Sequence, residues 1–163
     1  MSETSKKVGK GLLWGFGSLI GATVATAAGW IVYSKRFINH NFKLAGALEG
    51  DRLDYISKRA GRLSYYVDNT RKGTPLVLLH SINAASSAFE MRPLFDHYRQ
   101  TRPVYVLDLP GFGLSERSDR LYSPQLYQDA VSDFLQDVVG EPADVVALSL
   151  SSEFAALTAV HDP

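Results

Sequence analysis

Apolar residues follow two kinds of pattern along the chain. Residues 11–33 form a run of 23 positions without a charge, which is long enough for a helix across the roughly 30 Å hydrocarbon core of a membrane. From residue 61 onward the apolar residues instead form short blocks, separated by turn residues and by segments with helical spacing. The pattern therefore predicts one apolar helix followed by an α/β domain.

Four blocks in the second region are typical of strands. Residues 62–68 alternate weakly between polar and apolar, which suits an early strand. Residues 75–79, 103–107 and 144–148 are continuous apolar runs, as found in strands that are covered on both faces. Such strands are typical of a parallel sheet.

Helical segments are expected between these strands. Ser123 and Pro124 supply an N-cap and a first-turn proline for one helix. Another is expected over residues 86–98, interrupted at Pro93, and a last one over residues 150–160. Strands that alternate with helices predict a doubly wound, mostly parallel sheet, in which active sites lie at the carboxyl ends of the strands.

The apolar run has the flanking residues of a membrane anchor. Lys35 and Arg36 follow it, lysines precede it, and Trp14 and Trp30 near its ends suit the headgroup region. We therefore expect a single-pass membrane protein whose helix contacts lipid. The chain would comprise a basic tail, a transmembrane helix, a basic juxtamembrane connector and a partial α/β domain, at residues 1–10, 11–33, 34–60 and 61–163.

Alternatives for this run stay open. Residues 25–27 (ATA) would suit the cleavage site of a signal peptide, although the apolar stretch continues beyond them to a basic stop. A buried helix of a soluble protein would need a partner for every face. Small residues every four positions would let two such helices self-associate, or would simply reflect the composition of membrane helices, at Gly17, Gly21, Ala25 and Gly29.

Charge and composition narrow the function classes. Residues 1–60 carry nine Lys/Arg against four Asp/Glu, whereas residues 61–163 carry eight against thirteen. A basic front on an acidic body indicates two different surroundings, with lipid phosphate the anion that the front would meet. The chain has no cysteine, zinc-ligand spacing, phosphate loop or RNA-binding signature, so we expect no metal, cofactor or nucleic acid.

Three predicted strands end in polar or glycine-rich sequence. Because the carboxyl ends of parallel strands share one edge of a sheet, these segments are expected to lie together. The second is the most specific, since a D-x-P-G-F-G-x-S turn after a buried strand is rare by chance. In this order they resemble the first half of the α/β-hydrolase family, and the segments are HSIN at 80–83, DLPGFGLS at 108–115 and ALSLS at 147–151.

The resemblance implies that Ser149 is a nucleophile. The family exposes this serine on a sharp turn from a strand to a helix, with small residues, normally glycines, two positions to either side. Here those positions hold Ala147 and Ser151, which are small enough to keep the turn. A simple helix cap is the alternative role for Ser149.

The resemblance also implies supporting roles for other residues. The oxyanion hole would use the backbone N–H groups of Leu150 and Ile82. Asn83 would add a side-chain donor or form a turn. His80 is followed by Ser81 where the family has glycine, and it is expected to hold this loop. Structural roles in the second segment fall to Asp108, Gly111, Gly113 and Ser115.

The base and the acid of such an enzyme are not expected within this chain. The family places them after the nucleophile, in the order acid then histidine, but only fourteen residues follow Ser149. His161 would lie roughly 18 Å along the last helix, and Glu153 is expected to be a solvated first-turn acid. We therefore expect a fragment of a longer enzyme that is inactive by itself.

Two function classes remain after these arguments. The first is a membrane-anchored serine hydrolase that acts on a small ester-like or acyl substrate, through a carboxylic ester or thioester bond. A serine at the turn argues against dehalogenases and epoxide hydrolases of this fold, which use aspartate there. The second is a non-catalytic, membrane-anchored binding or scaffold module, which the altered glycine positions favour.

Overall fold

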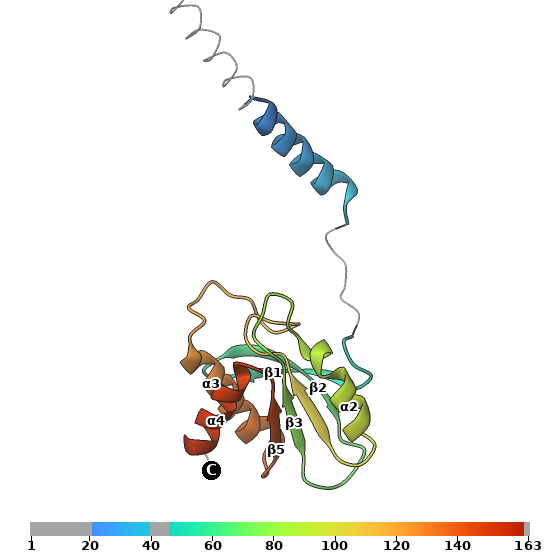
Figure 1. The fold of residues 1–163 in the computed structure, drawn as a ribbon, viewed down its shortest axis with the longest axis vertical. Coiled ribbons are helices and arrows are strands. Elements are labelled where there is room, and N and C mark those ends of the chain that lie inside the picture. Colours follow the sequence, from blue (N-terminus) through green and yellow to red (C-terminus); the bar gives the residue numbers. More distant parts are fainter. Residues whose placement is uncertain (1–20, 40–45, 162–163) are drawn as a thin grey trace, which may run out of the picture. The chain divides into compact units, whose positions relative to one another are not determined.

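The computed structural model describes residues 21–39 and 46–161 (Figure 1). The chain divides into two compact units, Met1–Leu44 and Ala45–Pro163. In the first unit residues 21–37 are helical, so part of the predicted membrane helix, including Gly17, lies outside the described residues. No helix among the described residues combines the length and the apolar character needed to cross a membrane.

The described helix of the first unit exposes large apolar side chains. Trp30 and Phe37 are 63% and 72% exposed. The ring of Tyr33 stacks on Trp30 at 5.9 Å between centroids and contacts Phe37 at 5.2 Å. These side chains, which a soluble helix would bury, therefore form a ladder of aromatic rings along the helix.

The described part of the second unit is a mixed five-stranded sheet between helices. Figure 1 shows α3 and α4 on one face and α2 on the other. The elements in chain order are β1 (Asp51–Ser57), β2 (Gly61–Asp68), β3 (Leu76–Leu79), the 3₁₀ helix η1 (Ala88–Met91), α2 (Arg92–Tyr98), β4 (Val104–Leu107), α3 (Pro124–Phe134), the π-helical turn η2 (Leu135–Val139), β5 (Asp144–Ala147) and α4 (Ser151–His161).

The strand order is β1-β2-β4-β3-β5. Strand β3 pairs in parallel with β4 on one side and with β5 on the other, while β1 and β2 add an antiparallel hairpin beside β4. The predicted α/β class and the parallel central strands are confirmed. The sheet is mixed rather than wholly parallel, because the chain enters it through that hairpin.

Strand β1 lies in the segment expected to be a connector. The compact unit begins at Ala45 rather than at residue 61, and β1 pairs with β2 along its whole length. Most β1 side chains are exposed, and Arg52 forms an ion pair with Asp54 at 3.0 Å on this strand. An edge strand of this kind has no continuous apolar block, so hydrophobic periodicity does not reveal it.

The central strands separate two hydrophobic cores. In β3, Val77 and Leu79 pack toward α3 and α4, whereas Leu76 and Leu78 pack toward η1 and α2. Successive side chains of a strand point to opposite faces, so a strand between two helical layers must be apolar at every position. This is the physical reason for the unbroken apolar runs in the sequence.

An ion-pair cluster in which Asp133 is buried and Arg59 is partly exposed fastens the β1–β2 turn to α3. The Arg59 guanidinium donates to Asp129 at 2.7 Å and to Asp133 at 2.8 Å, and the Ser57 hydroxyl donates to Asp133 at 2.5 Å. Burial raises the pKa of Asp133, but the hydrogen bonds from Arg59 and Ser57 outweigh it and hold that pKa below its usual value.

Asp133→Asn should lower the free energy of unfolding by about 2 kcal/mol at pH 7, because it leaves Arg59 and Ser57 with a weaker acceptor. A carboxylate with a depressed pKa stabilises the fold above its unfolded pKa of about 3.9, and this stabilisation is lost as pH falls through its folded pKa. Urea unfolding at pH 7 and pH 3 should show the difference from wild type shrinking in acid. The exposed Asp96→Asn serves as control, and a pH-independent difference would contradict the assignment.

Candidate active site

The three parallel strands end at one edge of the sheet. Leu79 is paired in register with Leu107 of β4 and with Ala147 of β5, so the segments that follow these residues begin at neighbouring points. These are the three polar segments identified in the sequence. Their proximity follows from the register alone, before any side chain is considered.

Ser149 occupies the tight turn between β5 and α4. Its φ is +55°, and it is the only non-glycine residue with a positive φ in the described parts of the chain. The turn is closed by N–H groups of Ser151 and Ser152, which donate to the carbonyls of Leu148 and Ser149 at 3.2 and 3.0 Å. The Ser149 residue is exposed at the start of the helix. A left-handed conformation at a serine costs about 1 kcal/mol, so the surrounding structure must enforce it.

Ser151 replaces one of the usual glycines and makes a contact that glycine cannot make. Its side chain is buried, and its hydroxyl donates to the carbonyl oxygen of His80 at 2.5 Å. Ala147, at the other glycine position, is half-buried against the core under α3. The turn is thus compatible with both replacements, and the serine additionally ties the start of α4 to the end of β3.

His80 is buried and both ring nitrogens have partners. Nε2 accepts the Leu109 N–H at 3.0 Å, so Nδ1 carries the proton and donates to the Ser81 carbonyl at 2.6 Å. Burial lowers the pKa of His80 below its usual value, against the opposing effects of the Ser81 carbonyl and nearby carboxylates. A neutral imidazole engaged at both nitrogens cannot take a proton from Ser149, and its geometry is that of a residue holding the loop.

The glycine-rich turn after β4 is built around the Asp108 carboxylate. One oxygen accepts the Ala88 N–H at 2.7 Å and the other accepts the Leu114 N–H at 2.9 Å. Ser115 donates its hydroxyl to the Asp108 carbonyl and accepts the Ser64 N–H at 2.8 Å. The Asp108 side chain therefore fastens this turn to the start of η1.

Two glycines make that turn sterically feasible. Gly113 has a φ of +50°, and a Cβ there would lie 2.1 Å from the Asp108 carboxyl carbon. Gly111 has a φ of +84°, and a Cβ there would lie 2.7 Å from the Tyr122 ring. The glycine spacing of the D-x-P-G-F-G-x-S run is thus required by the buried aspartate and by the tyrosine beside it.

The two amides expected to form an oxyanion hole lie on segments that start side by side. Leu150 follows Ser149 in the turn, and Ile82 lies in the loop after β3, where its side chain packs against the core. Within residues 21–39 and 46–161, neither backbone N–H donates a hydrogen bond. Both therefore remain able to donate to a ligand oxygen.

The loop after β3 has a hydrogen-bonding partner that the sequence pattern does not reveal. The Glu90 carboxylate accepts the Ser81 N–H at 2.8 Å, the Ser81 hydroxyl and the Asn83 side-chain amide at 3.1 Å. The Asn83 Oδ1 accepts the Ala85 N–H at 2.9 Å, so Asn83 has the turn-forming geometry. Burial raises the pKa of Glu90, but these hydrogen bonds outweigh it and leave that pKa below its usual value.

His161, at the end of α4, contacts partners other than Ser149. His161 Nδ1 lies 2.7 Å from the Leu157 carbonyl and 3.2 Å from the Gln128 side chain. Glu153 is exposed in the first turn of α4. In the described part of the chain, no histidine is hydrogen-bonded to the Ser149 hydroxyl.

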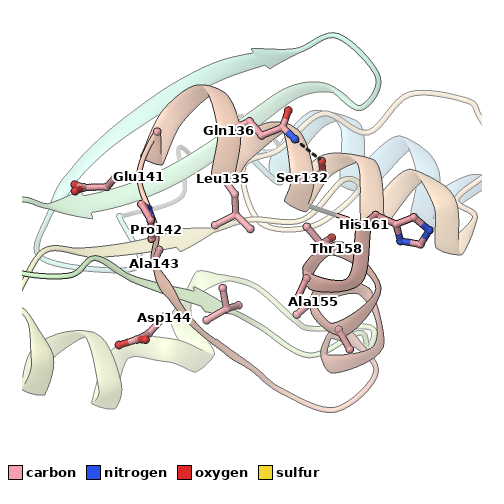
Figure 2. A pocket seen from close by; sticks show the side chains of 14 residues that line it. Ser132, Leu135, Gln136, Glu141, Pro142, Ala143, Asp144, Ala155, Thr158 and His161 are labelled. Atoms are coloured by element: carbon pink, nitrogen blue, oxygen red, sulfur yellow. Dashed lines mark hydrogen bonds between the residues drawn. The ribbon is translucent and has the colours of Figure 1, made fainter. Parts of the chain in front are cut away.

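A hollow of about 1090 Å³ lies between η2, β5 and α4, apart from these polar segments (Figure 2). Its lining includes Leu135, Ala143, Val145 and Ala155, but not Ser149 or the two amides. It runs along the edge of β5 opposite β3, where Val145 and Val146 are more than a third exposed. The candidate site is therefore the group of strand ends and not this hollow.

The chain belongs to the α/β hydrolase family, which it matches over residues 76–161. No curated protein sequence matches it. The family assignment agrees with the parallel strands, the glycine-rich turn and the turn at Ser149.

Solved structures share this fold. The Cif epoxide hydrolase from Acinetobacter nosocomialis is 21% identical, with a TM-score of 0.61 over 85% of this chain and 42% of its own. The naproxen esterase from Bacillus subtilis is 20% identical, with a TM-score of 0.58 over 71% of this chain and 40% of its own. A serine hydrolase involved in carbazole degradation, the CarC enzyme, is 18% identical, with a TM-score of 0.52 over 69% of this chain and 44% of its own. The chain spans about two fifths of the length of these proteins.

Gly113→Ala should lower the free energy of unfolding by about 3 kcal/mol, because the new Cβ collides with the Asp108 carboxylate in a left-handed backbone. Gly140→Ala is a matched control, since Gly140 has a φ of +68° but its nearest atom to a new Cβ is 3.9 Å away. The control should lose only about 1 kcal/mol. Equal losses for the two variants in urea unfolding would contradict the steric argument.

Ser149→Gly should be more stable than Ser149→Ala by about 1 kcal/mol, because glycine adopts a φ of +55° without the Cβ penalty. Both variants lose the hydroxyl, so their difference isolates the backbone cost. Thermal or urea unfolding of the pair measures it. Equal stabilities, or a more stable alanine variant, would show that the turn is not strained.

Proposed function

We propose that Ser149 is the nucleophile of a serine hydrolase that cleaves ester-like bonds, either carboxylic esters or thioesters. The observation that carries this proposal is the exposed Ser149 in a left-handed conformation between β5 and α4. Backbone strain at a non-glycine residue persists where the surrounding structure enforces it, and such positions cluster at active sites. A helix cap alone would not require this conformation.

In the proposed reaction, Ser149 Oγ attacks the substrate carbonyl carbon and the carbonyl oxygen becomes an oxyanion. The N–H groups of Leu150 and Ile82 donate to that oxyanion, and the positive end of α4 adds to its stabilisation. Collapse of the tetrahedral intermediate expels the alcohol or thiol and leaves an acyl-enzyme, which water then hydrolyses.

A general base is needed to remove the Ser149 proton, and a carboxylate is needed to orient that base. We propose that both come from outside the described residues. The engagement of both His80 nitrogens supports this, as does the length of the solved relatives, of which the chain spans about two fifths. In a polypeptide without such residues, the site would bind acyl compounds without efficient turnover.

We propose an acyl substrate rather than an epoxide because of the type of residue at position 149. Fold similarity alone does not separate these activities, since one neighbour is an epoxide hydrolase and another an esterase. In this family, enzymes that open epoxides use aspartate at the turn, and this chain has serine there. The serine therefore favours attack on a carbonyl.

We also propose that residues 11–33 anchor the protein in a membrane as a single pass. The exposed aromatic ladder of Trp30, Tyr33 and Phe37 and the following Lys35 and Arg36 support an interfacial end to this segment. The small-residue stripe would allow pairing of such helices, with Gly21 and Gly29 open to a close approach. Lipid-soluble esters would then reach the site from the bilayer.

A fluorophosphonate probe tests the nucleophile on the complete gene product in membranes. Such a probe phosphonylates an activated serine and mimics the tetrahedral intermediate. Labelling is expected for wild type and should fall to background for Ser149→Ala. Thr74→Ala is the control, because it removes an exposed hydroxyl before β3, away from the strand ends that form the site, and it should label like wild type.

Two outcomes of this experiment would count against the proposal. Labelling that persists in Ser149→Ala would identify a different nucleophile. Absence of labelling in the folded wild-type protein would favour the non-catalytic binding module.

A further inference from the structure

We propose that Glu90 is a positioning residue of the oxyanion loop, residues 80–83, and that its carboxylate, together with the His80 ring, sets the direction of the Ile82 N–H. The expected effect of Glu90 on catalysis rests on the proposed function, since it concerns the same oxyanion hole. Its expected effect on the conformation of the loop rests only on the hydrogen bonds of the loop.

The Glu90 carboxylate contacts the loop at both its backbone and its side chains. It accepts the Ser81 N–H at 2.8 Å and the Ser81 hydroxyl at 2.8 and 2.9 Å. It also accepts the Asn83 side-chain amide at 3.1 Å. The residues immediately before and after Ile82 are therefore both bound to the same carboxylate.

The other contacts on this stretch come from His80, Ser86 and the Asn83 turn. Ser86, which is buried, accepts the Asn83 N–H at 3.0 Å and contacts the Ser81 hydroxyl at 2.9 Å. The Ile82 N–H has no hydrogen-bond partner within the described residues. The Ile82 N–H shares a rigid peptide plane with the Ser81 carbonyl, which accepts from His80 Nδ1 at 2.6 Å. Glu90 holds the Ser81 N–H and the Asn83 side chain on either side of that plane, and so limits the backbone rotations that would turn the plane away.

Glu90 is itself held in a fixed place. It lies in η1, whose N-cap Ser87 accepts the Phe89 N–H and whose Ala88 N–H is bound to the buried Asp108. The positioning therefore passes from Asp108 in the turn after β4, through η1, to the loop after β3. Asp108 and Ser81 thus both contribute to holding the loop after β3, Asp108 through η1 and Ser81 through its bonds to Glu90.

The replacement of the family's glycine by Ser81 is explained by this contact. Glycine would offer only its N–H to Glu90, whereas serine adds a hydroxyl that bonds both carboxylate oxygens. A hydrogen bond to an ionised acceptor is stronger than one between neutral groups. The Ser81–Glu90 hydrogen bonds thus restrain the loop backbone at a position where glycine would leave it freer to rotate.

The experiment compares Glu90→Ala, Glu90→Gln and the control Asp96→Asn in the complete gene product. Asp96 is an exposed acid on the adjoining helix α2 and lies outside the site. Two quantities are measured: the second-order rate of labelling by the fluorophosphonate probe, and hydrogen exchange of a peptide that contains residues 80–86. Melting temperatures identify any variant that fails to fold.

Glu90→Ala should slow labelling about tenfold, less than the loss of a whole oxyanion donor, and should speed amide exchange in the loop. Glu90→Gln keeps one oxygen acceptor for the Ser81 N–H and should restore part of the rate. Asp96→Asn should leave both quantities unchanged. Ser81→Ala combined with Glu90→Ala should be less than additive, because both remove the same contact.

Unchanged labelling or unchanged loop exchange in a folded Glu90→Ala protein would overturn the proposal. So would a glutamine variant that melts like wild type but labels no faster than the alanine variant. If wild type is not labelled at all, the proposed function fails, and loop exchange alone decides whether Glu90 holds the loop. If Glu90→Ala does not fold, Glu90→Gln carries the same comparison.

Discussion

One buried histidine holds the strand ends together. His80 follows β3, its ring accepts the N–H of Leu109 from the segment after β4, and its carbonyl accepts the hydroxyl of Ser151 from the start of α4. The Phe112 ring packs edge-on against the imidazole at 5.3 Å between centroids. Because burial lowers the pKa of His80, the ring stays neutral and can accept and donate at the same time. Without its ring the three segments would still start side by side, but the Leu109 N–H and the Ser81 carbonyl would lose the partner that joins the segments after β3 and β4.

The candidate site contains residues whose backbones lie in the left-handed region. Ser149 and Gly113 both have left-handed backbones, one beside the exposed hydroxyl and the other against the Asp108 carboxylate. Such conformations are unfavourable in isolation, so the cores on both faces of the sheet must offset their cost. The apolar strands therefore supply the stability of the domain, and the short segments that follow them carry the candidate catalytic groups.

The sequence predicts those parts of the structure that depend on local patterns. The continuous apolar runs correspond to β3, β4 and β5, and Ser123 caps α3 as expected. Strand β1 is not predicted, because an exposed edge strand has no apolar block and depends on its pairing with β2. Glu90 is not predicted either, because its partner Ser81 lies nine positions away across a loop, where no periodicity links the two. The roles of Ser149, Leu150 and Ile82 stay predictions.

The central claim is that Ser149 attacks while Leu150 and Ile82 receive the oxyanion. A crystal structure of the complete protein after reaction with a phosphonate tests it most directly. The account predicts phosphorus bound to Ser149 Oγ, with the phosphonyl oxygen about 3 Å from both amide nitrogens. Phosphorus on another residue, or a phosphonyl oxygen directed away from these amides, would contradict it.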